Sequence, residues 1–455
     1  MAETWTQLGF LLVAICFIIA LKGLASPKTA RAGNLIGAVG AVLAVVLVFF
    51  AARPQNLVPI LVAIVIGALV GAIAARRVVM TAMPQLVAIF NGVGGGAAAL
   101  VALLEVRHAS EDLVGLVAAA FTILIGAVSF AGSGVTFAKL QELMSGRPTV
   151  IPYAPLVMAG VLVLSLGCAG AVIAGSFGVF GPLLAVLALA LGVLLVLPVG
   201  GADVPIVISL LNAFTGLSVA ASGYLLGNTL LLVAGTLVGA AGSLLTQLMA
   251  KAMGRSVLSI LFGSLRGGST LGSTQQSDRP VRSAGPADIA VLLGYARKVV
   301  LVPGYGLAVA QGQHALRELA EVLQARGTEV AYAIHPVAGR MPGHMNVLLA
   351  EANVPYDQLV EMDQVNPTFR QTNVALVVGA NDVVNPLARQ PTGSVIAGMP
   401  ILDVDQAESV VFLKRSMRPG FAGIENELLY DPKTTLLFGD AKDSLTKLVA
   451  DLKNL

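Results

Sequence analysis

The amino-acid sequence predicts an α-helical, polytopic membrane domain of about nine transmembrane helices, followed by an α/β domain built on a doubly wound parallel sheet. Apolar residues make up 56% of the 455 residues and charged residues only 12%, about half the charge of a typical soluble protein. The charge deficit lies almost wholly before Leu265. We therefore expect a membrane domain at residues 1–263, a flexible linker at 264–285 and a soluble domain at 286–455.

Long apolar segments recur from the start of the chain, and each is long enough to cross a bilayer as a helix. The first follows the acidic Glu3 and is too long for the core of a signal peptide, so we expect it to act as an anchor. The predicted spans are Leu8–Leu24, Leu35–Ala51, Leu57–Ala74, Leu86–Leu104, Leu113–Val135, Val157–Ala174, Pro182–Val199, Val204–Leu226 and Leu230–Met253.

Basic residues between the spans predict the orientation of the membrane domain. They gather in the first, third and fifth loops, at Lys22, Lys28, Arg31, Arg76, Arg77, Lys139 and Arg147. By the positive-inside rule, these loops face the cytoplasm and the N-terminus lies outside. An odd number of spans then delivers the soluble domain to the cytoplasm, in agreement with the charge pattern.

Several spans carry polar residues, which are costly in lipid and are candidates for function. Asn91 lies mid-span among small residues, where interhelical hydrogen bonding is the simpler interpretation. Asp203 begins the eighth span, where it could merely cap the helix. That span nevertheless holds a polar ladder, Asp203, Asn212, Thr215, Ser218 and Ser222. Together with Asn91, the ladder predicts a water-lined proton or ion path.

The segment 264–278, between the membrane spans and the soluble domain, is rich in Gly, Ser and Thr. Such a composition behaves as a flexible coil. It would let the soluble domain move relative to the membrane, although an inert tether is equally compatible with the sequence.

The soluble domain alternates short apolar runs with helical stretches. Helices are expected at Gly306–Arg326 and Gly343–Asn353. Strands are expected at Lys298–Val302, Glu329–Ile334, Val374–Val378, Pro400–Asp403, Ser409–Leu413 and Thr435–Phe438. This alternation predicts a parallel, Rossmann-like sheet, in which ligands bind beyond the carboxyl ends of the strands.

Glycine-rich, polar segments stand at those strand ends. Gly304 and Gly306 follow the first strand, where glycines let backbone amides approach a phosphate at a helix N-terminus. Val309 replaces the third glycine of the full motif, so a simple tight turn is an equally good interpretation. The other strand ends are 335–340, 379–382, 414–416 and 439–441. Their recurrence is a stronger signal than the first loop alone.

The strand ends also favour one nucleotide over another. The second strand ends Ala333-Ile334-His335-Pro336, without the acid that usually binds the ribose of NAD. Lys414, Arg415 and Ser416 instead suit an extra phosphate, as in NADP, unless they form a solvated basic turn. Arg340 is a candidate for the pyrophosphate, and Asn381 and Asp382 for the nicotinamide or ribose. His335 and His344 are expected to be structural.

No metal is expected. Both cysteines, Cys16 and Cys168, lie inside apolar runs, which argues against a disulfide framework or a cysteine metal site. Hydride chemistry would belong to a nicotinamide cofactor rather than to a protein base.

The runs Pro303–Gln311, His335–Glu351, Gly379–Asp382 and Lys414–Met417 resemble the beta subunit of proton-translocating NAD(P) transhydrogenase, and the resemblance covers essentially the whole chain. It implies hydride transfer between NAD(H) and NADP(H) coupled to inward proton movement. It also implies that NADP(H) binds here and that NAD(H) binds a separate domain on an alpha subunit. That partner would add further membrane helices, and two such assemblies would form a dimer. The expected location is the bacterial inner (plasma) membrane.

The resemblance also implies roles for individual residues. Val337–Pro342 would cover the phosphates, Gly379–Val383 would line the nicotinamide end, with Asn381 and Asp382 as catalytic candidates, and Lys414–Phe421 would grip the 2′-phosphate. The implied cofactor-binding residues are Gly304, Tyr305, Gly306, Val309, Val337, Ala338, Gly339, Arg340, Met341, Pro342, Gly379, Ala380, Asn381, Asp382, Val383, Lys414, Arg415, Ser416, Met417, Arg418, Pro419, Gly420, Phe421, Asp440 and Ala441.

One position departs from the family pattern. Several members carry a proton-handling histidine where Asn91 stands, and asparagine does not titrate near neutral pH. Either water and Asp203 carry the proton here, or a histidine on a partner helix lies opposite, which we favour; His108 is a poor substitute. The competing interpretation of the whole chain is a secondary ion transporter with a nucleotide-sensing regulatory domain. A structural membrane anchor is the weakest alternative.

Overall fold

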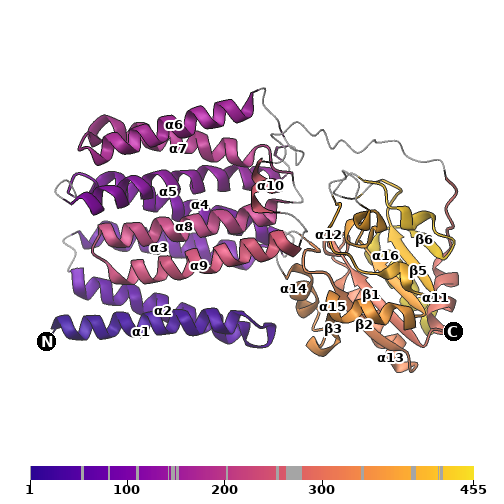
Figure 1. Cartoon of the computed structure of the whole chain (residues 1–455). Helices are drawn as coiled ribbons and strands as arrows, with labels where there is room; N and C mark the ends of the chain where they lie inside the picture. Colours follow the sequence, from indigo (N-terminus) through magenta and orange to yellow (C-terminus); the bar gives the residue numbers. More distant parts are fainter. Residues whose placement is uncertain are drawn as a thin grey trace. The chain divides into compact units, whose positions relative to one another are not determined.

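The structure is a computed structural model, and its internal contacts divide the chain into two compact units. The first contains the long apolar helices and the second contains a parallel sheet with its helices (Figure 1). The residues that the structure describes are 2–52, 56–79, 82–108, 112–141, 143–144, 149, 153–200, 203–252, 256–262, 279–339, 343–390, 396–418, 420 and 424–455.

Nine helices in the described part of the chain are long and apolar enough to cross a membrane, as the sequence predicts. They are α1 (Ala2–Leu24), α2 (Pro27–Ala52), α3 (Leu57–Arg77), α4 (Met83–Glu105), α5 (Leu113–Leu140), α6 (Ala154–Ile173), α7 (Phe177–Val196), α8 (Val204–Leu225) and α9 (Thr229–Ala252). The seventh begins earlier than expected, with Pro182 inside it rather than at its start. The short α10 (Val257–Phe262) follows.

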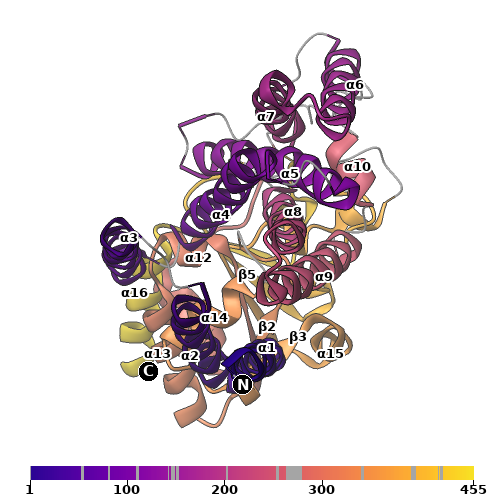
Figure 2. The same ribbon diagram turned by 90° about the vertical axis from the view of Figure 1, so that its left-hand side faces the viewer.

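Helices α4, α5 and α8 form the centre of the first unit, as the end-on view in Figure 2 shows. Small residues let these helices approach closely, since a Cβ atom on Gly126 would lie 2.6 Å from the carbonyl oxygen of Gly95. Helix α8 meets α9 in the same way, because a Cβ on Gly216 would lie 2.5 Å from the amide nitrogen of Gly239. These four glycines therefore serve packing between helices.

Lys139 was assigned to a loop from the sequence, but it lies in the last turn of α5 and its side chain is buried. Its Nζ donates hydrogen bonds to the carbonyl oxygens of Val196 (3.1 Å), Leu197 (2.5 Å) and Val199 (2.8 Å). These carbonyls lie at the end of α7, where the backbone has no helical donors left. Lys139 thus caps α7 and ties it to α5.

The second unit is a sheet of six strands in the order β3-β2-β1-β4-β5-β6, and every neighbouring pair is parallel. This is the strand order of a doubly wound, dinucleotide-binding fold. The strands are β1 (Lys298–Pro303), β2 (Glu329–Ile334), β3 (Leu359–Glu361), β4 (Val374–Val378), β5 (Ser409–Lys414) and β6 (Thr434–Phe438). The predicted parallel α/β class is confirmed.

Helices and short turns cover the two faces of the sheet. One face packs against α11 (Pro286–Gly294), α12 (Tyr305–Val309), α13 (Gln313–Ala325), α14 (His344–Glu351) and α16 (Ala441–Lys453). The other face packs against α15 (Met362–Val365) and a series of 3-10 turns that includes η9 (Glu427–Tyr430). The central strands β1 and β4 are buried on both sides, which explains their unbroken apolar sequences.

Two sequence-based element assignments in this unit are wrong. The strand expected at Pro400–Asp403 forms no ladder. Ile401 and Leu402 are buried there, but the backbone carbonyl and amide groups of this segment bond to residues outside the sheet. The single helix expected at Gly306–Arg326 is instead α12 and α13, separated by a turn in which Gln311 has a φ of 50°. In addition, the short edge strand β3 was not predicted.

The end of the predicted linker belongs to the second unit. Leu436 in β6 donates its amide to Arg282 and accepts from the amide of Ala284, so residues 282–284 run beside β6. Arg279 forms a bidentate ion pair with Glu427 (2.8 and 2.9 Å). Residues 279–284, at the end of the linker predicted at 264–285, are therefore bonded to the second unit, and its glycine-rich part, 264–278, lies outside the described residues.

Candidate functional site

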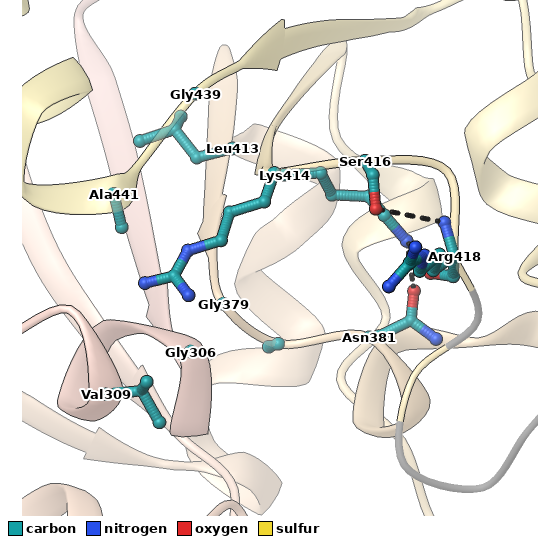
Figure 3. A pocket seen from close by; sticks show the side chains of 12 residues that line it. Gly306, Val309, Gly379, Asn381, Leu413, Lys414, Ser416, Arg418, Gly439 and Ala441 are labelled. Carbon is teal, nitrogen blue, oxygen red and sulfur yellow. Dashed lines mark hydrogen bonds between the residues drawn. The ribbon is translucent and has the colours of Figure 1, made fainter.

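A pocket of about 270 Å³ opens at the carboxyl ends of β1, β4, β5 and β6. The strand order reverses between β1 and β4, and this is where doubly wound sheets bind their ligands. Figure 3 shows Lys414 and Arg418 on the side of Asn381, with Val309 on the opposite side of the pocket. The lining residues are Gly306, Val309, Gly379, Ala380, Asn381, Leu413, Lys414, Arg415, Ser416, Arg418, Gly439 and Ala441.

Ten of these twelve residues are among those that the sequence predicts for cofactor binding. The two others, Leu413 and Gly439, are the last buried residue of β5 and the glycine that follows β6. Both could have been inferred, since each immediately precedes a predicted residue at a strand end.

The glycine loop after β1 packs directly on the loop after β4. The amide of Gly304 donates to the carbonyl of Val378 and the amide of Gly306 donates to that of Gly379, both at 2.9 Å. A Cβ atom on Gly304 would lie 2.5 Å from the backbone of Ala380, so only glycine fits. These two glycines bring the loops together, and their amides are not free to hold a phosphate as the sequence suggested.

Gly379 is required by its conformation as well as by its surroundings. Its φ is +70°, a region that other residues rarely adopt, and a Cβ there would lie 2.5 Å from the Cα of Gly306. The close approach of these two glycine-containing turns leaves backbone, rather than side chains, as the floor of the pocket. A flat ligand can lie close to such a surface.

Lys414 supplies positive charge at the pocket wall. Its Nζ donates to Oδ1 of Asn381 (3.1 Å) and to the carbonyl oxygen of Arg418 (3.3 Å). Burial lowers the pKa of Lys414 from its ordinary value, while the negative charge of Asp382 opposes that change. Its present acceptors on Asn381 and Arg418 are neutral, so an incoming anion would gain a charge-assisted bond.

Arg415 lies beside Lys414 and pairs with a carboxylate. Its Nη2 donates to Oδ2 of Asp440 at 2.7 Å, and Asp440 in turn caps α16 by accepting the amide of Lys442. Ser416 accepts a long bond (3.4 Å) from the amide of Arg418, which folds the segment after β5 back on itself. The turn that the sequence identifies as basic is therefore ordered around the pocket.

Asn381 and Asp382 are held in place by the segment after the basic turn. Asn381 donates from Nδ2 to Oδ1 of Asp382 (2.9 Å), and its carbonyl accepts Nδ2 of the buried Asn426 (2.9 Å). Gly420 lies so close that a Cβ there would stand 2.6 Å from Oδ1 of Asp382. Asn426 was not predicted, and its polar type before η9 was the only signal in the sequence.

The loop after β2 is organised by a buried histidine. His335 accepts the amide of Val337 at Nδ1 (3.3 Å) and donates from Nε2 to the carbonyl of Pro400 (2.8 Å). Burial lowers the pKa of His335 to about 4, although the bond to Pro400 opposes this. The ring is neutral near pH 7 and serves the fold, which supports the structural role expected for it.

The other predicted residues are not among the lining residues given above, or they lie outside the described part of the chain. Tyr305 meets the buried ring of His344 edge-on, with centroids 6.0 Å apart, and Gly339 packs on the same ring. Ala338 and Val383 are buried, and Met417 packs against the core. Residues outside the described part of the chain are Arg340, Met341, Pro342, Pro419 and Phe421.

A polar cluster lies between α4, α5 and α8 in the first unit. Asn91 donates from Nδ2 to the hydroxyls of Ser133 (3.0 Å) and Ser129 (3.3 Å). Ser129 also bonds to the hydroxyl of Thr215 (2.6 Å) and donates to the carbonyl of Leu211 (2.9 Å). The backbone carbonyl of Asn91 also accepts a long bond (3.4 Å) from the hydroxyl of Thr215 on α8, so Asn91 joins three helices by hydrogen bonds. Ser129 and Ser133 were not predicted.

The polar ladder expected on α8 is not a single face. Ser218 and Ser222 are buried, but Asn212 is exposed on this chain. Asn212 follows the buried Leu211, and one residue turns a helix by about 100°. Asp203 is buried at the start of α8 and makes no side-chain capping bond to that helix, so capping does not account for it.

Comparison with known proteins identifies the family. The NAD(P) transhydrogenase beta subunit model matches residues 6–451. Two sequences described as NAD(P) transhydrogenase subunit beta, from Rhodospirillum rubrum and from a named strain of that species, are each 45% identical over 460 residues. The alignments cover 99% of this chain and 99% of each relative.

The chain belongs to the NAD(P) transhydrogenase beta subunit family. As a member, it is a membrane protein of an oxidoreductase family that uses nicotinamide nucleotides, and the family name implies an alpha subunit as partner. The membership agrees with the strand order, the pocket at the β1–β4 reversal and the nine apolar helices.

Proposed function

We propose that this chain is the NADP(H)-binding subunit of a proton-translocating transhydrogenase in a bacterial inner membrane. In this proposal, hydride passes between NAD(H) on an alpha subunit and NADP(H) in the pocket of the second unit. While hydride is transferred, protons move inward through the helical unit. The N-terminus lies outside and the pocket lies in the cytoplasm.

The observation that carries the choice of NADP(H) is the basic turn at the pocket. Lys414, Arg415 and Ser416 line it together, whereas the residues that follow β2 in the sequence are the buried His335 and Pro336, where an NAD site usually has an acid. Guanidinium, ammonium and hydroxyl groups donate hydrogen bonds to phosphate oxygens, whereas a carboxylate would repel the phosphate. The residues therefore fit a dinucleotide that carries a 2′-phosphate.

Each wall of the pocket has a separate task in this proposal. Lys414 and Arg415 bind the 2′-phosphate, and the close-packed Gly306 and Gly379 leave room for the ligand against backbone. Asn381, held by Lys414 and by Asn426, orients the nicotinamide end. The cofactor supplies the hydride chemistry when it is bound. The protein contributes position and charge.

The membrane part of the proposal involves Asp203, Asn91 and the hydroxyls near them. Asparagine bonded to two serines holds helices together but does not take up a proton near neutral pH. In this proposal a titrating group on a partner helix completes the path. Asn212 is exposed on this chain, which leaves its side chain accessible to such a helix. One charge crossing about 100 mV is worth about 2.3 kcal/mol. That energy shifts a nearly balanced hydride exchange by more than about tenfold.

The test uses the chain purified with its alpha subunit and reconstituted in vesicles. We expect NADP⁺ to bind the intact assembly through Lys414, so K414Q should weaken its binding about 10- to 100-fold while NAD⁺ binding hardly changes. K447Q, which removes the same charge from the exposed face of α16, is the matched control. An equal loss of NADP⁺ affinity in K414Q and K447Q would contradict the proposal. So would a pocket that binds NAD⁺ as tightly as NADP⁺.

A second measurement tests coupling in the same vesicles. Reduction of NADP⁺ by NADH should run faster when a proton gradient is imposed in the inward direction and slower when it is reversed. Proton movement that proceeds without either nucleotide would instead identify an ion transporter with a regulatory domain.

A further inference from the structure

Asp440 and Arg415 form an ion pair at the edge of the pocket. The two side chains come from the ends of neighbouring strands, β6 and β5, and Nη2 lies 2.7 Å from Oδ2. Arg415 is 60% exposed and Asp440 is 35% exposed, so water reaches both partners. An exposed pair of this kind is weak and can be exchanged for another anion.

The second oxygen of Asp440 is also in use. Oδ1 accepts the amide of Lys442 at 3.0 Å, at the N-terminus of the thirteen-residue α16. A guanidinium group and a helix-terminal amide are the groups that commonly bind phosphate oxygens. The carboxylate of Asp440 therefore occupies, with its two oxygens, two donors that a phosphate would use.

Arg415 differs in this respect from its neighbour. Lys414 donates to the side-chain oxygen of Asn381 and to a carbonyl, both of which are neutral acceptors. Arg415 donates to a carboxylate. A phosphate that arrives at the pocket adds charge stabilisation at Lys414, but at Arg415 it must displace or share a negative group.

We propose that Asp440 is an internal anion that competes with the 2′-phosphate of NADP(H) for Arg415 and thereby limits how tightly the cofactor is held. The inference rests on the proposed function, since it concerns the same pocket. Its consequence is kinetic as well as thermodynamic. NADP(H) must leave the pocket in every catalytic cycle. When it leaves, the carboxylate of Asp440 pairs with Arg415 again, which stabilises the empty site and favours release.

The test is the neutral variant D440N in the full chain with its alpha subunit. Asparagine still accepts the amide of Lys442 as a cap, so α16 keeps its N-terminus while the charge is lost. We expect NADP⁺ to bind about two- to fivefold tighter, with NAD⁺ unchanged and the gain shrinking as salt is raised. In turnover, KM for NADP⁺ and kcat should both fall, because release slows. D440S, another neutral cap, should behave in the same way.

Two further variants decide whether the effect is competition for Arg415. Asp443 lies exposed in the first turn of α16, so D443N removes the same charge from the same helix end. In the R415Q background, D440N should bring no gain, because there is no guanidinium to release. Unchanged or weaker NADP⁺ binding in D440N, an equal gain in D443N, or a gain that persists with R415Q would overturn the inference.

The same experiment separates this inference from the proposed function. If the unaltered protein binds NADP⁺ no better than NAD⁺ and R415Q has no effect, the proposed function fails. If NADP⁺ is preferred and R415Q weakens it, but D440N does nothing, only the role of Asp440 is refuted.

Discussion

Acidification from about pH 7.5 to about pH 5 is expected to destabilise the sheet unit through His335. The side chain is 2% exposed and its two ring nitrogens join the loop after β2 to the segment at Pro400. A protonated ring would lose its acceptor at Nδ1, leaving the amide of Val337 without a partner. Burial lowers the pKa of the folded His335 to about 4, even though the bond to Pro400 favours the charged form.

The lowered pKa of His335 sets the sign and the size of the loss in folding stability. Because the folded pKa lies below the unfolded value of about 6.5, the unfolded chain takes up the proton first as the pH falls. The stability is fully present above about pH 6.5 and is lost between about pH 6.5 and pH 4. At about pH 5 the loss amounts to about 2 kcal/mol, and it approaches about 3 kcal/mol near pH 4.

Hydrogen–deuterium exchange on the intact chain measures this change, after correction for the intrinsic pH dependence of exchange. In the unaltered protein, the free energy of opening measured for peptides from β1 and β2 should fall by about 2 kcal/mol between about pH 7.5 and about pH 5. In H335Q they should lose little, since glutamine can donate to Pro400 but does not titrate. H314Q removes an exposed histidine from α13 and should follow the unaltered protein. Equal losses in the unaltered protein and in H335Q would refute the reasoning.

Three other changes test the packing around the site. Gly379→Ala places a Cβ against the backbone of Leu307 at a φ of +70°, so we expect a loss of about 3 kcal/mol and weak nucleotide retention, measured by thermal unfolding with and without NADP⁺. Tyr332→Phe removes a hydroxyl that is buried and has no partner among the described residues, and should raise stability by up to about 1 kcal/mol in the same assay. Arg279→Gln breaks the bidentate pair with Glu427 and should speed hydrogen exchange at residues 279–284, with β1 unaffected.

Each of these has an outcome that contradicts it. A Gly379→Ala protein within about 0.5 kcal/mol of the original would mean that the loops have room to move apart. A clear loss of stability in Tyr332→Phe would show that the hydroxyl has a partner. Unchanged exchange at 279–284 in Arg279→Gln would mean that the backbone bonds to β6 hold that segment alone.

Much of the site could be predicted because parallel strands end at one edge of their sheet. Once Lys298–Val302, Val374–Val378 and Ser409–Leu413 are recognised as strands, the residues after them must meet. Pairwise details could not be predicted in this way. The capture of the Gly306 amide by Gly379 and the pairing of Arg415 with Asp440 depend on distances between segments far apart in the sequence.

The sequence-based assignments that are wrong also depend on contacts between segments, which the sequence does not show. The apolar run at Pro400–Asp403 has the composition of a strand, but burial alone makes no ladder, and its backbone groups bond to Val383 and His335. The three-residue β3 is too short to show an alternation of apolar and polar residues. On α8, the sequence shows which residues are polar, while the packing of α4 and α5 decides that Ser218 is buried and Asn212 is not.

The sequence by itself predicted about nine spans and the parallel sheet, and the described part of the chain has both. Lipid demands long apolar helices, and a sheet buried on both faces demands apolar strands. These are properties of each segment taken alone. Only the tertiary structure decided that Lys139 caps α7, that Asn91 joins three helices and that a carboxylate lies on Arg415. Such contacts form between segments, and their geometry exists only when the segments are packed together.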